Sequence, residues 1–310
     1  MDLEELKNTI GSGLLSFPVT DFAADGSFSA DSYARRIEWM SSFSIAALFA
    51  AGGTGELFSL GWEEYRAVVK TAVDVQSCSV PVIAGVGYGT SMAIEMARAA
   101  EAEGADAILL LPHYLVSSPQ NGQAEHVRKV CEAIDIGVIY YARGQSRLSA
   151  EQLEALAGQC PNLIGYKDGF GDLLNLSKIV SRLGDRLVYV GGVPTAEVLA
   201  KPYMSAGVTT YSSAVFNFVP EIAIMFYDSV ATGNQTLVDD LLKSFFLPFI
   251  DLRDRCPGYS VSLVKAGVGL VGHPAGPVRP PLTCPNVDEV DELEGLIQIA
   301  KARMAAIVEE

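Results

Sequence analysis

Short apolar runs recur along the chain, and each is followed by a segment with a helical hydrophobic pattern. The runs have four or five residues and no charged residue, which is typical of strands buried on both faces of a parallel sheet. There are eight of them, at residues 14–18, 46–50, 81–84, 107–111, 137–141, 163–166, 187–190 and 208–211. Between them, in 63–75 and 91–103 for example, apolar residues recur at helical spacing and charged residues occupy the other face.

Strands that alternate with helices predict an α/β fold with a parallel sheet. Eight repeats favour a closed (β/α)8 barrel, or TIM barrel, over the alternative of an open doubly wound sheet. The last repeat ends near Gly233. Two further helical patterns follow, at 237–252 and 293–308, and a proline-rich stretch separates them. We therefore predict a catalytic barrel domain at 1–233 and a small helical C-terminal domain at 234–310.

Composition and charge narrow the class of partner. Hydrophobic residues make up 49% of the 310 residues and charged residues 19%, so the chain can bury a large core. The net charge of −15 disfavours nucleic acid and anionic membrane surfaces. It leaves room for a small anionic substrate, because a few cations can dominate the field inside a cleft. The N-terminal residues are acidic, unlike a signal peptide, and no apolar run is long enough to span a membrane, so we expect a cytoplasmic protein.

The cysteines and histidines are dispersed. The odd number and wide spacing of the cysteines predict reduced thiols rather than disulfides: Cys78, Cys131, Cys160, Cys256 and Cys284. The histidines do not occur in the HExxH or HxH spacing of metal sites, so we predict no metal site: His113, His126 and His273.

In a (β/α)8 barrel the active site lies at the carboxyl ends of the strands, where the loops converge on one mouth. Lys167 directly follows the sixth apolar run, whereas most of the nine lysines lie in segments that resemble helix surfaces. Desolvation there disfavours the ammonium form and lowers the lysine pKa, as a Schiff-base nucleophile requires. The alternative is a lysine whose stem lines the barrel and whose head reaches water or pairs with Asp168.

Two glycine-rich turns follow the second and third runs. The backbone N–H groups of residues 52–56 can bind a carboxylate, and the hydroxyl of Thr54 adds a donor, although any tight strand-to-helix loop would look the same. The turn at 85–89 lacks the GxGxxG spacing, and the chain has no GxxxxGK[ST] motif, so we expect no nucleotide site.

Taken together, these residues resemble the dihydrodipicolinate synthase and N-acetylneuraminate lyase superfamily. The similarity rests on Gly53-Thr54-Gly55-Glu56 after strand two, Tyr141 at the end of strand five and Lys167 at the end of strand six. Within the superfamily, residues 166–172, 191–197 and 211–218 are most similar to the 5-dehydro-4-deoxyglucarate dehydratase branch.

Some positions depart from these relatives. Gly53 replaces the first of the synthase's paired threonines, and Tyr141-Ala142-Arg143-Gly144 replaces its Tyr-Asn-Val-Pro segment. Ala142 also stands where the dehydratase branch is expected to have asparagine. The first two departures count against synthase activity.

The resemblance implies a class I lyase that forms a Schiff base and needs no metal or organic cofactor. The reaction it implies is the decarboxylating dehydration of 5-dehydro-4-deoxy-D-glucarate to 2,5-dioxopentanoate, with release of water and carbon dioxide. Lys167 would condense with the ketone and Tyr141 would shuttle protons. Gly53 and Thr54 would hold the carboxylate next to the ketone.

Two further substrate contacts are expected at the mouth. Arg143 lies two residues beyond Tyr141 and can form a bidentate pair with the distal carboxylate, with Arg147 as its rival. An exposed loop arginine is the ordinary alternative. Ser212, at the end of strand eight, is expected to bind a substrate hydroxyl or transfer a proton, unless it is merely a small residue at a crowded rim.

Other functions and the assembly stay open. A class I aldolase or synthase acting on pyruvate or a 2-keto-3-deoxy sugar acid fits the same scaffold. A non-catalytic ligand-binding barrel is more remote, because the Lys167 and Tyr141 pair is intact. In the synthase branch a tyrosine near the position of Tyr114 reaches a neighbouring subunit, so the resemblance implies a homo-oligomer, a dimer of dimers.

Overall fold

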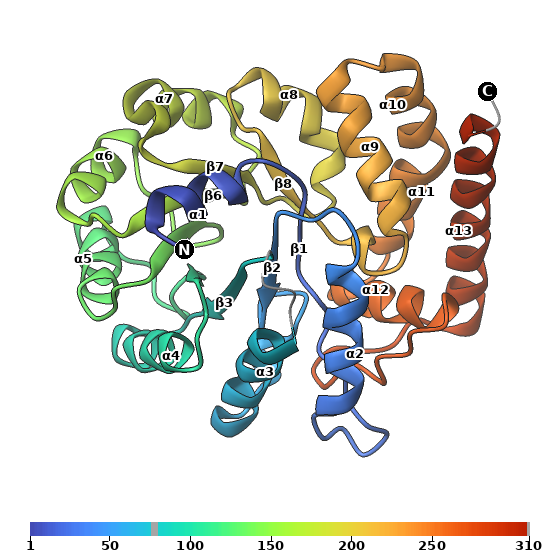
Figure 1. The fold of residues 1–310 in the computed structure, drawn as a ribbon, viewed down its shortest axis with the longest axis horizontal. Coiled ribbons are helices and arrows are strands. Elements are labelled where there is room, and N and C mark those ends of the chain that lie inside the picture. The colour runs from blue at the N-terminus through green and yellow to red at the C-terminus, as the bar shows by residue number, and fades with distance from the viewer. Residues whose placement is uncertain (76–79, 309–310) are drawn as a thin grey trace.

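Eight parallel strands close into a barrel in chain order, as the computed structural model of residues 1–75 and 80–308 shows (Figure 1). The strands are β1 Leu15–Ser16, β2 Ala47–Ala50, β3 Val82–Val86, β4 Ala107–Leu110, β5 Gly137–Ala142, β6 Leu163–Asp168, β7 Val188–Gly191 and β8 Thr210–Ser213. Because β8 pairs with β1, the predicted (β/α)8 barrel is confirmed and the open sheet is excluded.

Helices surround the barrel, and side chains cap the start of two of them. They are α2 Ala30–Ser41, α3 Trp62–Val75, α4 Thr90–Ala102, α5 Gln120–Cys131, α6 Ala150–Gln159, α7 Leu173–Leu183, α8 Ala200–Ser205 and α9 Pro220–Thr232. Ser149 accepts a hydrogen bond from the backbone N–H of Gln152 at the start of α6, and Asp172 caps α7 in the same way. Gly233 ends α9 with a φ of 77°, a backbone conformation that glycine adopts easily.

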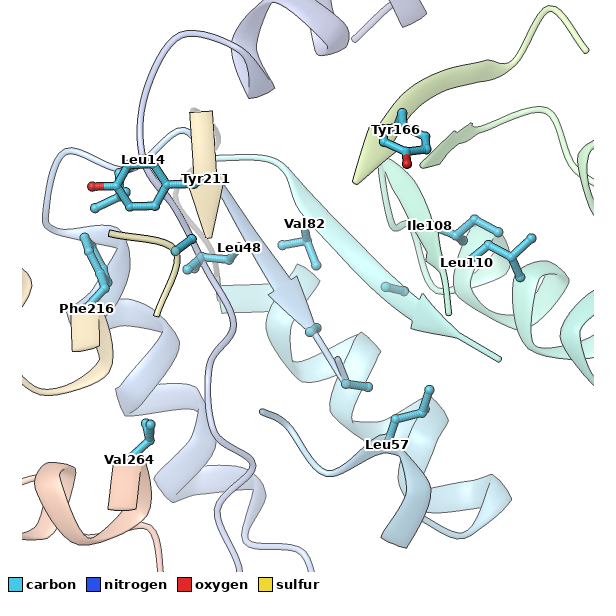
Figure 2. Close-up of a cluster of buried hydrophobic side chains, with 14 of the residues drawn as sticks. Leu14, Leu48, Leu57, Val82, Ile108, Leu110, Tyr166, Tyr211, Phe216 and Val264 are labelled. Atoms are coloured by element: carbon cyan, nitrogen blue, oxygen red, sulfur yellow. The ribbon is translucent and has the colours of Figure 1, made fainter. Parts of the chain in front are cut away.

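Apolar side chains form two layers, one on each face of the sheet. The outer layer lies between strands and helices and includes Leu48 of β2, Val82 of β3 and Ile108 of β4 (Figure 2). The inner layer fills the barrel and includes Phe49 and Leu109, which alternate with residues of the outer layer along their strands. The barrel interior is therefore a packed core, not an open channel.

A helix that the sequence pattern did not predict closes the other end of the barrel. In α1, Leu3–Ile10, both Leu6 and Ile10 are buried against the inner layer. Asp2 caps this helix by accepting a 2.7 Å hydrogen bond from the N–H of Glu5. The segment is short, and its charged residues obscure the two apolar positions that it buries.

The C-terminal region is helical throughout its regular structure as far as residue 308. Its elements are α10 Gln235–Leu241, a π-helical turn Leu242–Phe246, α11 Leu247–Arg253, α12 Tyr259–Leu270 and α13 Val287–Val308. The predicted helix at 237–252 corresponds to the run from α10 to α11. The π turn lies where Pro248 has no N–H for the carbonyl of Ser244. The predicted helix at 293–308 is the later part of α13, which lies at the rim of the molecule (Figure 1).

Helix α12 was missed because it is apolar on nearly all sides and shows no amphipathic stripe. The proline-rich segment after it returns to the barrel, where His273 stacks on Trp39 with ring centroids 4.2 Å apart. Arg279 in this segment donates hydrogen bonds to Glu64 of α3. The division into two domains at residue 233 stays a prediction.

Two further findings concern membrane-spanning helices and cysteines. Over residues 1–75 and 80–308, no helix is long and apolar enough to cross a membrane. Four cysteines carry free thiols: Cys131, Cys160, Cys256 and Cys284. Cys78 lies outside the described residues.

Candidate active site

A cavity of about 270 Å³ opens at the carboxyl ends of the strands. All the residues predicted to form the site contribute to its lining: Gly53, Thr54, Tyr141, Arg143, Lys167 and Ser212. The loop after β7 and the C-terminal helices complete it with residues that the sequence pattern did not suggest, among them Gly192, Thr195, Phe249, Arg253 and Ser260. The described lining contains three cations, Lys167, Arg143 and Arg253, and no acidic side chain. It therefore suits an anionic ligand despite the overall negative charge.

Lys167 points into the barrel because β6 contains a bulge. Val138 of β5 is paired with Leu163, but its neighbour Ile139 is paired with Gly165, so Ile164 is an extra residue in β6. From Gly165 onward the alternation is shifted by one residue, and Lys167 lies opposite Tyr141 on the inner face. The bulge thus directs this side chain into the cavity.

The carboxylate of Asp168 lies on the outer face and does not pair with Lys167. It accepts hydrogen bonds from the backbone N–H groups of Phe170 and Gly171 and a 2.9 Å hydrogen bond from the Tyr203 hydroxyl. Lys167 Nζ instead donates to Ser212 Oγ at 2.6 Å. Asp168 therefore holds the loop after β6, while the amine faces the cavity.

The surroundings of the amine favour its neutral form. Lys167 is 2% exposed, and Nζ lies 4.6 Å from the centre of the Phe17 ring and 5.1 Å from that of Tyr141. Burial lowers the pKa of Lys167 to about 7, the nearby charge of Arg143 lowers it as well, and Asp168 acts in the opposite direction. A substantial fraction of neutral amine is thus available near neutral pH, as nucleophilic attack on a ketone requires.

Gly192 makes room for this lysine. A Cβ atom at position 192 would lie 2.6 Å from Lys167 Cγ, so only glycine allows the lysine stem to pass. The carbonyl of Gly192 accepts a 2.9 Å hydrogen bond from Tyr141 Oη. The residue after β7 therefore supports both predicted catalytic side chains.

Tyr141 is held by hydrogen bonds on both sides of its hydroxyl. Besides donating to Gly192, Oη accepts a 3.0 Å hydrogen bond from Arg143 Nη1. Burial raises the pKa of Tyr141, and Arg143 partly offsets this effect. The phenol is therefore neutral and connected to a donor and an acceptor, an arrangement that allows it to pass a proton.

The two candidate arginines have different surroundings. Arg147 pairs with Asp172, its guanidinium lies 4.8 Å from the centre of the Phe170 ring, and it does not contribute to the cavity lining. Arg143 lines the cavity. Of the two, only Arg143 is placed to meet a ligand in this cavity.

The turn with Gly53 and Thr54 is anchored through Glu56, a residue to which sequence reasoning gave no role. Glu56 is fully buried and forms a 2.7 Å ion pair with Lys265 of α12. It also accepts a hydrogen bond from the backbone N–H of Arg279. The C-terminal helices thus fix the loop that is expected to bind the carboxylate, a long-range contact that no local pattern indicates.

Among the residues that the structure describes, no group of three or more histidine, cysteine, aspartate or glutamate side chains could hold a metal ion. The geometry defines a class of protein: a (β/α)8 barrel with a buried, partly neutral lysine beside a tyrosine at the strand ends. The chain belongs to the dihydrodipicolinate synthetase family, whose model matches residues 11–300.

Relatives of known name cover almost the whole chain. A protein of Ectopseudomonas mendocina (strain ymp), named probable 5-dehydro-4-deoxyglucarate dehydratase, is 54% identical over 98% of this chain and 100% of its own length. The 5-dehydro-4-deoxyglucarate dehydratase of Pseudomonas putida is 52% identical, over 96% of this chain and 98% of the relative.

Solved structures share the fold at lower identity. The dihydrodipicolinate synthase from Bacillus clausii is 27% identical, with a TM-score of 0.85, and the match covers 96% of this chain and 99% of that one. That from Oceanobacillus iheyensis has a TM-score of 0.87 at 24% identity, over 96% of this chain and 98% of that one. The predicted family resemblance is thus confirmed, and so is the branch to which the similar segments pointed.

Proposed function

We propose that the protein is a class I decarboxylating dehydratase that converts 5-dehydro-4-deoxy-D-glucarate to 2,5-dioxopentanoate, water and carbon dioxide. The observation that carries the proposal is the buried Lys167, with a pKa of about 7, in a cavity whose described lining is cationic and free of acids. The names of relatives that are 52–54% identical over nearly the whole chain support the choice of substrate.

The reaction can run on one lysine. Lys167 Nζ attacks the ketone, and loss of water gives a protonated imine. A proton then leaves the adjacent CH2, and the resulting enamine expels the next hydroxyl as water, which leaves a conjugated iminium. As carbon dioxide departs, the electron pair of its C–C bond moves into this iminium and forms a dienamine that carries an enol.

The product forms when the dienamine takes up a proton and the enol becomes an aldehyde. Hydrolysis of the imine then releases 2,5-dioxopentanoate and restores the amine of Lys167. The water consumed here equals the water lost when the imine formed. The balance is therefore one dicarboxylate in, and one oxo acid, one water and one carbon dioxide out, with no oxidant or reductant.

Each remaining predicted residue has a role in this scheme. Tyr141 passes protons during imine formation and during loss of the hydroxyl, which its two hydrogen bonds support. Gly53 and Thr54 bind the carboxylate next to the ketone. Ser212 accepts a hydrogen bond from Lys167 Nζ and can bind a substrate hydroxyl once the imine has formed. Arg143 binds substrate beside Tyr141.

Product analysis tests the proposal. Purified protein given 5-dehydro-4-deoxy-D-glucarate should release equal amounts of carbon dioxide and 2,5-dioxopentanoate. Release of pyruvate instead would replace the dehydratase with an aldolase on the same scaffold. If no 2-oxo acid is converted, the barrel is a binding protein and the proposal fails.

We also propose that the protein works in the cytoplasm as a homo-oligomer, a dimer of dimers. The loop after β4 carries three consecutive apolar residues, Tyr114, Leu115 and Val116, that are 65%, 71% and 63% exposed in the single chain. Such a patch at the barrel mouth is typical of a surface that a second subunit covers.

A further inference from the structure

Arg253, at the C-terminal end of α11, reaches the cavity from outside the barrel. Its side chain is 13% exposed and contributes to the lining. Nε pairs with Asp254 Oδ1 at 2.7 Å, and Nη1 donates to Thr195 Oγ1 at 2.6 Å. Within the described part of the chain, Nη2 has no hydrogen-bond or ion-pair partner, so this nitrogen is available to a ligand.

The residue that holds Arg253 has a strained backbone. Thr195, in the loop after β7, is 3% exposed and has a φ of 54°, in the left-handed region that β-branched residues rarely adopt. Strain of this kind persists where the surroundings over-determine a residue, and it is concentrated at ligand sites. Here it places the Thr195 hydroxyl where it accepts from the guanidinium of Arg253.

The other arginine of the cavity is already committed to the reaction centre. Arg143 donates to Tyr141 Oη, and its charge lies near enough to Lys167 to influence the amine. A dicarboxylate whose first carboxylate lies at Gly53 and Thr54 still needs a cation for its far end. The hydrogen bonds of Arg253 go instead to Thr195, in the loop after β7, and to Asp254.

We infer that Arg253, positioned by Thr195, binds the far carboxylate of the substrate and makes the site selective for dicarboxylate 2-oxo acids. This inference deepens the proposed function and rests on it for the identity of the dicarboxylate. The interaction is a charge-assisted hydrogen bond in a partly desolvated cavity, the kind of contact that discriminates between charged and uncharged ends.

The same contact should act mainly on binding. It forms in the bound substrate and weakens as the carboxylate loses its charge and leaves as carbon dioxide. An interaction that is stronger in the ground state than in the transition state affects KM more than kcat. Arg253→Ala should therefore raise KM for the dicarboxylate by roughly tenfold or more, with a smaller change in kcat.

A test that needs no turnover compares two six-carbon oxo acids. 2-Oxoadipate has a far carboxylate and 2-oxohexanoate has a methyl group there, and neither carries a hydroxyl that can be expelled. Borohydride reduction traps the imine of each, so the concentration that gives half-maximal labelling can be measured. The wild type should prefer 2-oxoadipate by roughly tenfold or more, and Arg253→Ala should remove most of this preference.

The matched control is Arg255→Ala. Arg255 lies two residues along the chain, is 46% exposed and pairs with Glu292, and it does not line the cavity. This variant loses the same charge from the same region and should keep the preference. If pyruvate fails to label Arg253→Ala, the site is damaged in that variant. Arg253→Lys then takes its place in the test, because lysine keeps the positive charge but lacks the planar guanidinium. We expect Arg253→Lys to lose the preference for 2-oxoadipate severalfold.

The inference is overturned if the wild type shows no preference for 2-oxoadipate, or if Arg255→Ala loses that preference. It is also overturned if Arg253→Ala keeps the preference unchanged. If Arg253→Ala is damaged, an unchanged preference in Arg253→Lys has the same meaning. If the preference is lost in Arg143→Ala and kept in Arg253→Ala, Arg143 binds the far carboxylate instead. The proposed function fails separately, if the wild type prefers 2-oxoadipate but does not convert 5-dehydro-4-deoxy-D-glucarate.

Discussion

Lys167 owes its chemistry to the groups immediately around it. Two aromatic rings lie close to Nζ, the side chain is buried, and Ser212 Oγ is its hydrogen-bond acceptor. Charging the amine is costly there, which is the physical origin of the lowered pKa. Arg143 acts on both Lys167 and Tyr141, so a change at this residue should be visible in how the site responds to pH.

The rate of imine formation with pyruvate should rise with pH and level off above about 7, because only the neutral amine of Lys167 attacks. Arg143 lowers the pKa of Lys167, so Arg143→Ala should raise that pKa and move the midpoint to higher pH. Trapping rates measured across this range provide the test. Arg147→Ala, which removes a charge outside the cavity, is the control and should leave the midpoint in place. A midpoint that falls or stays fixed in Arg143→Ala would contradict this account.

At the scale of single elements, what could be predicted depended on whether the signal was local. Most of the strands were predictable because they coincide with short apolar runs, whereas β8 is largely polar and begins two residues into the run at 208–211. The place of Lys167 at the mouth followed from its being at the end of such a run. Its inward direction did not follow, because the bulge at Ile164 shifts the alternation along β6. Helix α12 and Arg253 were missed, since their roles depend on where the C-terminal helices pack.

The buried ion pair between Glu56 and Lys265 connects the turn that contains Gly53 and Thr54 to α12. Removing one partner leaves a buried charge without compensation, so Lys265→Met should cost about 3–5 kcal/mol of stability, measured by chemical unfolding. The double variant Glu56→Gln with Lys265→Met should lose much less stability than the two single variants lose in sum.

The exposed pair between Arg255 and Glu292 serves as the control. Removing Arg255 should hardly move the unfolding midpoint, because water screens both charges. Additive losses from Glu56→Gln and Lys265→Met would show that the two residues do not stabilise each other in the way proposed.

At the scale of the whole molecule, an acidic protein encloses a cationic cavity. The net charge is −15, yet the described lining of the cavity has three cations and no acidic side chain. The apolar loop at residues 114–116 lies in the connection that follows β4 at the same end of the barrel. Sequence alone could not show that this loop is exposed, because its apolar residues could equally have packed against the barrel.

The proposed assembly predicts how a charge in this loop behaves. Leu115→Asp should dissociate the oligomer, because each copy would bury a carboxylate in the interface. Leu174→Asp is the control, since Leu174 is 70% exposed, close to the 71% of Leu115, but lies on α7. Sedimentation gives the oligomeric state of the wild type and of both variants, and only Leu115→Asp should be dissociated. A monomeric wild type, or an oligomer that Leu115→Asp leaves intact, would contradict the assembly.

The central claim, that Lys167 forms an imine with the substrate, is tested most directly by reduction with borohydride followed by mass spectrometry of the peptides. In the presence of 5-dehydro-4-deoxy-D-glucarate or pyruvate, a single residue, Lys167, should acquire the mass of the reduced adduct. Lys167→Ala should acquire none and should not turn over the substrate. A label on another lysine, or an active Lys167→Ala variant, would contradict the account.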